Sequence, residues 1–193
     1  MNWYKKAEEA AVSVTSEQFG AMTREEKVAL ARNPSISPET QRLFFTEEYA
    51  GKRGDIFGAL WRLAVNRGIT LATQRLFFTE KYENKVKVLE NLASRKSIAP
   101  EVQRLFFTES YEGTWDVLLH LAINSDITPE TQRLFITESY EGKSEILTFL
   151  ARNNQKFLRD FTRDELLQIK KVARGSIKLL VLSKRPKQIA GVP

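Results

Sequence analysis

The sequence predicts an all-α protein, a right-handed α-solenoid of about four to five stacked two-helix repeats with capping helices at both ends. Two observations carry this prediction. The heptapeptide QRLFFTE occurs at residues 41–47, 74–80 and 103–109, and it returns as QRLFITE at 132–138. Successive copies begin 33, 29 and 29 residues apart, a length that holds one pair of helices. Each copy is followed by Leu-x-x-Leu-Ala, the spacing of a helix with one apolar stripe.

Such a helix pair cannot bury its apolar face alone, so stacking of neighbouring pairs must supply a continuous core. The end units then need caps, and both ends of the chain depart from the repeat pattern. We therefore expect capping helices at 1–22, the repeat array at 23–154 and basic capping helices at 155–193.

The first helix of each unit begins at a recognisable start signal. The copies at Ser37 and Thr128 place an N-cap hydroxyl before proline and glutamate. The copy at Thr70 keeps the hydroxyl without the proline, and the copy at Ala99 keeps the proline without the hydroxyl. The helix is predicted to end just before a residue that favours the left-handed C′ conformation. Those residues are Gly51, Asn84, Gly113 and Gly142.

The second helix of each unit carries the apolar stripe. Its two leucines and alanine recur in all four copies, at residues 60, 63 and 64; 89, 92 and 93; 118, 121 and 122; and 147, 150 and 151. A half-repeat at 23–33 shares this ending, and Thr23 with Glu26 predicts a capping box at its start. The 33-residue copy holds about one extra helical turn near residues 52–55.

The chain ends are predicted to be capping helices. At the N-terminus these are 2–12 and 16–22. At the other end, Thr162 and Glu165 predict a second capping box, opening a helix that stops near Gly175. Residues 177–183 then look like a last, degenerate second helix.

The stretches LARNPSISPETQRLF and LAINSDITPETQRLF resemble the variant leucine-rich repeat, whose units run LAxNPxxPxxxLxxLA. The resemblance covers about residues 24–153. It implies a helical solenoid related in shape to HEAT-type arrays, in a family known mostly as binding scaffolds. The unit here is longer than the family's usual one, and a chain without cysteine cannot hold the iron–sulfur cluster of that family's best-known member.

The repeated phenylalanines and glutamines are predicted to be scaffold. On a helical wheel the phenylalanines fall in a broad apolar arc, so we expect them in the core. Ile136 in the fourth copy would preserve packing and would abolish ring stacking on a ligand. The glutamines lie beside this arc, where a buried amide needs partners, so we expect them to bond the neighbouring repeat's backbone. They are Gln41, Gln74, Gln103 and Gln132.

An arginine follows each glutamine and lies on the other side of the helix, at Arg42, Arg75, Arg104 and Arg133. One interpretation is a row of guanidinium groups for phosphates, joined by the basic residues Lys170, Lys171 and Arg174. The preferred interpretation is a solvent face held by ion pairs with the glutamates of the same helices. Those glutamates include Glu39, Glu101 and Glu130, three residues before their arginines.

Positions facing away from the leucine stripe of the second helix change from copy to copy. They hold Gly58 and Arg62, Lys87 and Asn91, Asp116 and His120, and Glu145 and Phe149, flanked by Trp61, Glu90, Leu119 and Thr148. Solenoids use an extended surface of this kind for recognition. We expect a partner-binding site at Trp61, Arg62, Asn91, His120 and Phe149, against the alternative of neutral drift on a solvated face.

The composition argues against several kinds of site. Cysteine is absent and His120 is the only histidine, so we expect no metal site, no cofactor and no enzyme. The EGKS stretch at 141–144 lacks the upstream glycine of a phosphate-binding loop. No signal-peptide pattern or membrane-length apolar run is present, which predicts a cytoplasmic monomer away from membranes.

Two functions stay open: a non-catalytic protein-interaction module using the second helices, and a nucleic-acid-binding protein using the arginines and the basic C-terminal end. The net charge of +6 belongs to that end, because residues 1–165 hold 23 basic and 24 acidic side chains. A few HEAT-type proteins are base-repair glycosylases, which leaves a remote enzymatic variant open. A third interpretation lays residues 170–187 on an acidic membrane, although capping suits their apolar stretch better.

Overall fold

The computed structural model describes residues 11–46, 57–82, 84–109, 111, 113–153 and 161–172. Within these ranges the regular elements are helices, and the β-structure is one isolated bridge between Val12 and Ile36. The helices are α1 Ser16–Ala21, α2 Arg24–Arg32, α3 Pro38–Leu43, α5 Phe57–Ala64, α6 Leu71–Thr79, α7 Lys85–Ser94, α8 Pro100–Thr108, α9 Thr114–Ile123, α10 Pro129–Thr137, α11 Lys143–Asn153 and α12 Arg163–Val172. The predicted all-α class is confirmed.

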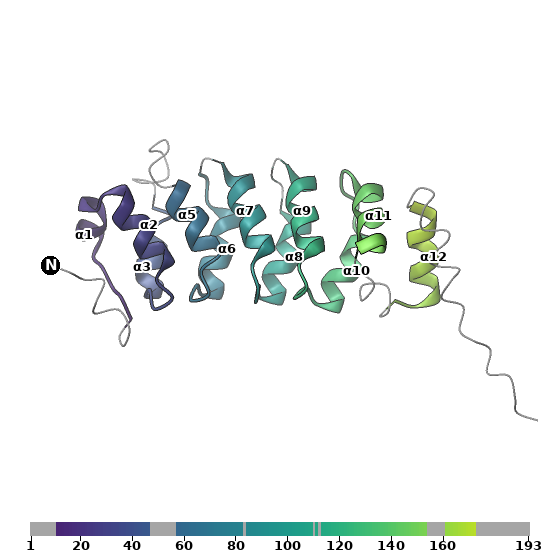
Figure 1. Ribbon diagram of the computed structural model, residues 1–193, viewed down its shortest axis with the longest axis horizontal. Coiled ribbons are helices and arrows are strands. Elements are labelled where there is room, and N and C mark those ends of the chain that lie inside the picture. The colour runs from purple at the N-terminus through teal and green to yellow at the C-terminus, as the bar shows by residue number, and fades with distance from the viewer. Residues whose placement is uncertain are drawn as a thin grey trace, which may run out of the picture.

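The helices pack in two rows that follow chain order. In one row α2, α5, α7, α9 and α11 each contact the next, and in the other α3, α6, α8, α10 and α12 do the same. Figure 1 shows this progression along the long axis of the molecule, from α1 at one end to α12 at the other. Each helix pair therefore lies between the pair before it and the pair after it.

The predicted start signals are confirmed at most helices. Thr23 and Glu26 form the expected capping box of α2, and the hydroxyls of Ser37, Thr70 and Thr128 accept from the backbone three residues on. Thr162 and Glu165 form the second capping box, before α12. These side chains satisfy N–H groups that the helix itself leaves without partners.

The predicted ends of the first helices are wrong. Those helices stop four residues earlier, at Thr79, Thr108 and Thr137. The left-handed residues instead stand directly before the second helices, as Asn84 with φ 54°, Gly113 with φ 67° and Gly142 with φ 70°. A tyrosine anchors each connecting segment, because its hydroxyl donates to a phenylalanine carbonyl of the first helix. The pairs are Tyr82 with Phe77, Tyr111 with Phe106 and Tyr140 with Phe135.

The N-terminal expectation is confirmed in part. Helix α1 matches the predicted 16–22, but residues 11 and 12 of the predicted helix 2–12 are not helical. Val12 is extended, donating to Ser35 at 2.7 Å and accepting from Ser37 at 2.9 Å. Those two backbone bonds, made to the loop before α3, replace the helical ones. Residues 2–10, Gly51, the extra turn at 52–55, Gly175 and 177–183 lie outside the described residues.

The phenylalanines form a ladder through the core, as predicted. The second phenylalanine of one copy packs edge-to-face on the first of the next, with ring centroids 4.9 Å apart for Phe45 and Phe77 and 4.8 Å apart for Phe78 and Phe106. Phe107 and Phe135 repeat the contact at 4.9 Å, although Phe107 is only half-buried. Such pairs stabilise by about 0.5–1.5 kcal/mol beyond their burial. The fourth copy replaces the second phenylalanine by Ile136, which has no ring to continue the edge-to-face contacts.

The glutamines also bridge neighbouring repeats, as predicted. Gln41 donates to the carbonyl of Gly68 at 3.0 Å and accepts from the Thr70 N–H at 3.0 Å. Gln103 makes the same two bonds two repeats further along, donating to the carbonyl of Asp126 at 3.3 Å and accepting from the Thr128 N–H at 2.9 Å. Gln74 accepts from Ala99 at 3.2 Å. At Gln132 the series stops, and the buried Oε1 of this residue has no hydrogen-bond partner among the described residues.

A second bridge, made by asparagines after the second helices, was not predicted. Asn66 donates to the carbonyls of Ala31 and Asn33 at 2.7 and 2.8 Å, and its Oδ1 accepts from Gly68 at 2.7 Å. Asn124 donates equivalently to Ala93 and Arg95, both at 2.7 Å. Each amide therefore joins two carbonyls of the preceding repeat and closes its own turn.

Arg95 occupies the asparagine position of the repeat between these two. Its side chain is buried, with 6% exposure. One terminal nitrogen donates to the Arg67 carbonyl at 3.3 Å, while Nε and Nη1 are buried without a partner. Burial lowers the pKa of this guanidinium. The array therefore contains one inter-repeat position where a poorly paired charge replaces a well-paired amide.

Candidate functional site

The row α2, α5, α7, α9 and α11 presents an outer face, which we define by the side chains of these helices opposite their leucine stripes. The predicted partner-binding residues all lie on it and are half-buried: Trp61, Arg62, Asn91, His120 and Phe149. Arg62 stacks on Trp61, with its guanidinium carbon 4.1 Å from the ring centroid. The five residues come from four different helices and therefore share a surface rather than a single pocket.

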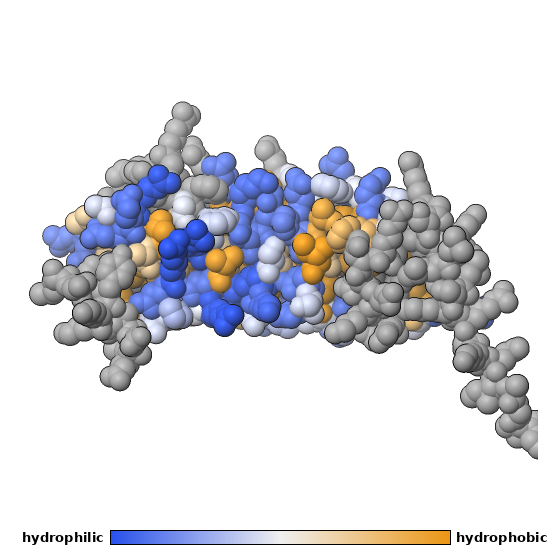
Figure 2. All heavy atoms as spheres, in the orientation of Figure 1, coloured by the Kyte–Doolittle hydropathy of each residue, from blue (hydrophilic) through white to orange (hydrophobic). Residues whose placement is uncertain are grey.

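Helix α9 carries an apolar stripe on the outer face that the sequence analysis did not single out. Trp115, Leu119 and Ile123 follow at spacings of four residues, which places them on one side of a helix. Trp115 is 38% exposed and Ile123 is 52% exposed, and Leu119 between them is half-buried. Figure 2 shows apolar atoms gathered over α9 among mostly hydrophilic neighbours. Exposed apolar groups gathered in this way mark interaction surfaces.

The backbone of the next repeat holds the Trp115 ring in place. A Cβ atom added at Gly142 would lie 1.8 Å from Cδ1 of Trp115, so the indole packs directly against this glycine. The φ of 70° at Gly142 independently favours glycine. The packing of the next repeat therefore restricts the position of this ring.

Between the apolar residues of α5 and α9, helix α7 contributes a polar network. Glu90, 8% exposed, pairs with Lys87 at 2.8 Å and lies 3.8 Å from Nε2 of His120. The Glu90 hydrogen bond and charge raise the pKa of Lys87. Nδ1 of His120 lies 3.0 Å from the Ser94 hydroxyl, which donates to the Glu90 carbonyl at 2.9 Å.

The Ser94 hydroxyl makes two contacts, because it donates to the Glu90 carbonyl and also lies against Nδ1 of His120. Which of the two atoms donates in the second contact is set by the tautomer of His120. The contact joins residues from α7 and α9, and only the stacking of the repeats brings them together.

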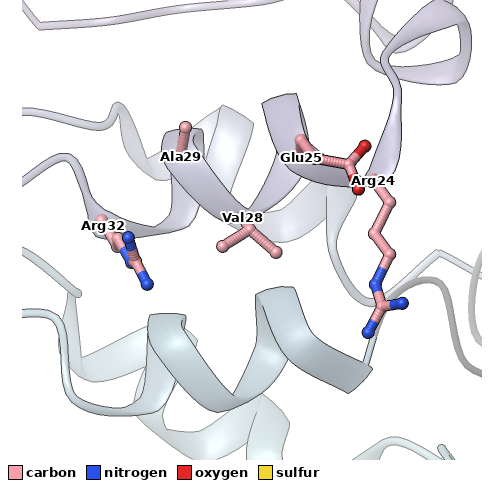
Figure 3. Close-up of a pocket in the computed structure, with 5 residues that line it drawn as sticks. All are labelled: Arg24, Glu25, Val28, Ala29 and Arg32. Carbon is pink, nitrogen blue, oxygen red and sulfur yellow. The ribbon is translucent and has the colours of Figure 1, made fainter.

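A hollow opens at the other end of the outer face, between α2 and α5. Its volume is about 620 Å³, and it is lined by Arg24, Glu25, Val28, Ala29 and Arg32. Figure 3 shows the side chains of Arg24, Val28 and Arg32 extending from α2 toward the neighbouring helix. Gly58 of α5 lies close to two of these lining residues, because a Cβ there would lie 3.6 Å from Val28 and 3.7 Å from Arg24. Other repeats carry larger side chains at the positions equivalent to Gly58 and Ala29.

The arginines of the first helices form a separate surface. Arg42, Arg75 and Arg104 are exposed, and within the described ranges no carboxylate forms an ion pair with them. The ion pairs expected with Glu39 and Glu101 are therefore not formed among the described residues, whereas Glu47, another glutamate of the first copy, lies outside them. An exposed ion pair is only slightly lower in free energy than two separately hydrated charges. These arginine side chains therefore extend into solvent.

The fourth arginine of this series is paired differently. Nε of Arg133 donates to Glu165 of α12 at 3.0 Å, and this arginine contributes to the lowered pKa of Glu165, after the hydrogen bonds from Thr162. Lys171 is exposed on α12. The side chain of Lys170 and all of Arg174 lie outside the described residues.

Comparison with known proteins adds no assignment, since no protein-family model, no curated protein and no solved structure matches the chain. Among the described residues, no group of histidine, aspartate and glutamate side chains could hold a metal ion. None of the helices described is both long enough and apolar enough to cross a membrane. The candidate surfaces of the described residues are therefore the outer face and the row of arginines on the first helices.

Proposed function

We propose that this chain is a right-handed α-solenoid of about four to five helix pairs that acts, without catalysis, as a protein-binding module. The partner lies on the outer face of α2, α5, α7, α9 and α11. Trp61, Arg62, Asn91, His120 and Phe149 contribute to that contact, and the α9 stripe is its centre. The protein works as a monomer in the cytoplasm and needs no cofactor.

One observation carries this proposal: α9 exposes Trp115 and Ile123 on either side of the half-buried Leu119, and its other side is fully buried. Residues that maintain the array, such as Leu118 and Leu121, have no exposure and recur in each repeat. The equivalent positions of α7 and α11 are mostly polar, whereas the copy at α5 repeats the apolar pattern with Phe57, Trp61 and Val65. Leaving the stripe residues of α9 in water is unfavourable by about 25 cal/mol per Å² of apolar surface. A partner that covers them recovers this free energy, and aromatic anchors of this kind dominate protein interfaces.

The test is a selection of random 16-residue peptides on the protein, followed by binding measurements on two matched double variants. Leu119→Glu with Ile123→Glu places charge on the outer face, and Arg42→Gln with Arg104→Gln removes charge from the other row. The proposal predicts that the first variant loses most selected peptides and the second retains them. Selected peptides that bind both variants equally would contradict it.

A second function, binding of nucleic acid, is favoured by the three exposed arginines without ion pairs. If Arg42, Arg75 and Arg104 each contact one phosphate, the affinity for duplex DNA falls as salt is added. A plot of the logarithm of the affinity against the logarithm of the salt concentration then has a slope of about −3. Replacing all three by glutamine then removes that slope. An affinity for DNA that does not change with salt concentration would count against this second function. So would the absence of DNA binding at physiological salt.

A further inference from the structure

We propose that the partner on the outer face is an extended protein segment with an acidic side chain about seven to nine residues away from an apolar one. The acidic side chain enters the hollow between α2 and α5, and the apolar side chain packs on the α9 stripe. This inference rests on the proposed function and specifies the chemistry of the partner.

The hollow suits an acidic group because of the charges around it. Arg24 and Arg32 are exposed, and no described carboxylate forms an ion pair with either. One carboxylate, Glu25, also lines the hollow, which leaves an excess of one guanidinium. Arginine side chains bind carboxylates through two parallel hydrogen bonds.

Arg62 adds positive charge next to this hollow. It lies one repeat further on, at the position equivalent to Ala29, and its contact with the Trp61 ring holds it on the surface of α5. The region from α2 to α5 is therefore cationic, whereas α9 offers Asp116 beside its apolar stripe. Charge complementarity consequently favours an acidic residue at the α2 end and no acidic residue at the α9 end.

The distance between the two contact points sets the spacing in the partner. Helices α2, α5, α7 and α9 contact one another in succession, which makes three helix-to-helix steps. At interaxial distances of about 8–10 Å, three steps span about 24–30 Å. An extended chain advances about 3.3 Å per residue, so about seven to nine residues cover this span. A shorter linker cannot reach both points.

The test is an NMR titration of the full-length protein with four synthetic peptides. The probe carries two aspartates, an eight-residue glycine–serine spacer and a Trp-Leu pair. One control replaces the aspartates by lysines, a second shortens the spacer to two residues, and a third replaces Trp-Leu by Ser-Ser. We expect the probe to bind at least about fivefold more tightly than each control, because each control loses one of the two contacts.

Two protein variants locate the contact. Arg24→Gln with Arg32→Gln is expected to weaken binding of the aspartate peptide about fivefold or more while leaving the lysine peptide unchanged or tighter. Arg75→Gln with Arg104→Gln, which removes the same charge from the other helix row, should leave the probe's affinity unchanged. An equal loss of probe affinity in the two double variants would show that only the net charge of the protein matters. That result would overturn the proposal.

The outcomes separate this inference from the function it rests on. If the selected 16-residue peptides need Leu119 and Ile123 but show neither acidic residues nor the spacing, the outer face binds partners and this inference is wrong. If they bind the Leu119→Glu, Ile123→Glu variant as well as the parent, the proposed function itself fails. The inference is also overturned if the probe causes no NMR chemical-shift changes at concentrations up to about 1 mM. That result would mean a binding free energy weaker than about −4 kcal/mol.

Discussion

Replacing Arg95 by asparagine should stabilise the protein, although it removes a large side chain from a buried position. The parent residue leaves Nε and Nη1 buried without partners and makes one bond at 3.3 Å, to the Arg67 carbonyl. Asparagine at the equivalent position, Asn66, makes three bonds of 2.7 to 2.8 Å to the preceding repeat and its own turn. The substitution therefore exchanges a poorly paired cation for an amide that the array is built to accept.

The magnitude follows from those bonds. Three new hydrogen bonds contribute about 0.5–1.5 kcal/mol each, and each buried unpartnered group removed relieves about 1–3 kcal/mol. Against this stand one lost hydrogen bond and the cavity left by the longer side chain, at about 24 cal/mol per Å³. We expect a net gain of about 1–3 kcal/mol in the free energy of unfolding, since the turn around Ser97, with φ 65°, also acquires a side-chain acceptor.

The assay is urea unfolding followed by circular dichroism, with the reverse substitution Asn124→Arg as the matched partner. That variant should lose about 2–4 kcal/mol, because Asn124 bonds the carbonyls of Ala93 and Arg95. Arg104→Asn, on an exposed helix surface, controls for the loss of an arginine. A midpoint for Arg95→Asn equal to or below that of the parent would refute the reasoning.

Three further predictions follow. Gln103→Leu should lower the free energy of unfolding by about 2–4 kcal/mol, because three inter-repeat and local bonds are lost; a loss no larger than that of Arg104→Gln in the same urea assay would contradict it. Gly142→Ala should lower it by about 1–2 kcal/mol, because the φ is left-handed, and should shift tryptophan emission as Trp115 is displaced; unchanged emission would oppose it. Burial raises the pKa of three tyrosines above the ordinary 10.0, so the folded state holds protons that the unfolded state releases. These tyrosines are Tyr82, Tyr111 and Tyr140. The free energy of unfolding should therefore keep its full value below pH 10 and fall as pH rises above it. Absorbance at about 295 nm follows tyrosine ionisation, and ionisation of all five tyrosines near pH 10 in the folded protein would contradict this.

The scaffold was predictable from the sequence because its residues repeat. Periodicity alone placed the phenylalanines in the core, and the rule that a buried amide must be paired predicted the bridge made by Gln41 and Gln103. The position of Asn84 was predicted wrongly because a left-handed residue is typical of the end of a helix, whereas here it stands directly before α7.

The surfaces were less predictable, because they depend on contacts between repeats. The ion pairs expected within the first helices are absent at Arg42, Arg75 and Arg104 among the described residues, while Arg133 pairs with a glutamate of α12 that lies 32 residues away. The network of Ser94, Glu90 and His120 similarly needs two repeats in register. The α9 stripe did have a sequence signal, because Trp115, Leu119 and Ile123 form an i, i+4, i+8 apolar series.

The stacking of helix pairs in register is the claim on which both surfaces depend, and spin-label distances test it directly. The chain has no cysteine, so labels can be attached to cysteines introduced at the exposed equivalent positions Glu39, Glu101 and Glu130. At about 8–10 Å per step, we predict backbone separations of about 16–20 Å between positions 39 and 101 and about 24–30 Å between 39 and 130. A separation between 39 and 130 equal to or shorter than that between 39 and 101 would contradict the stacked array.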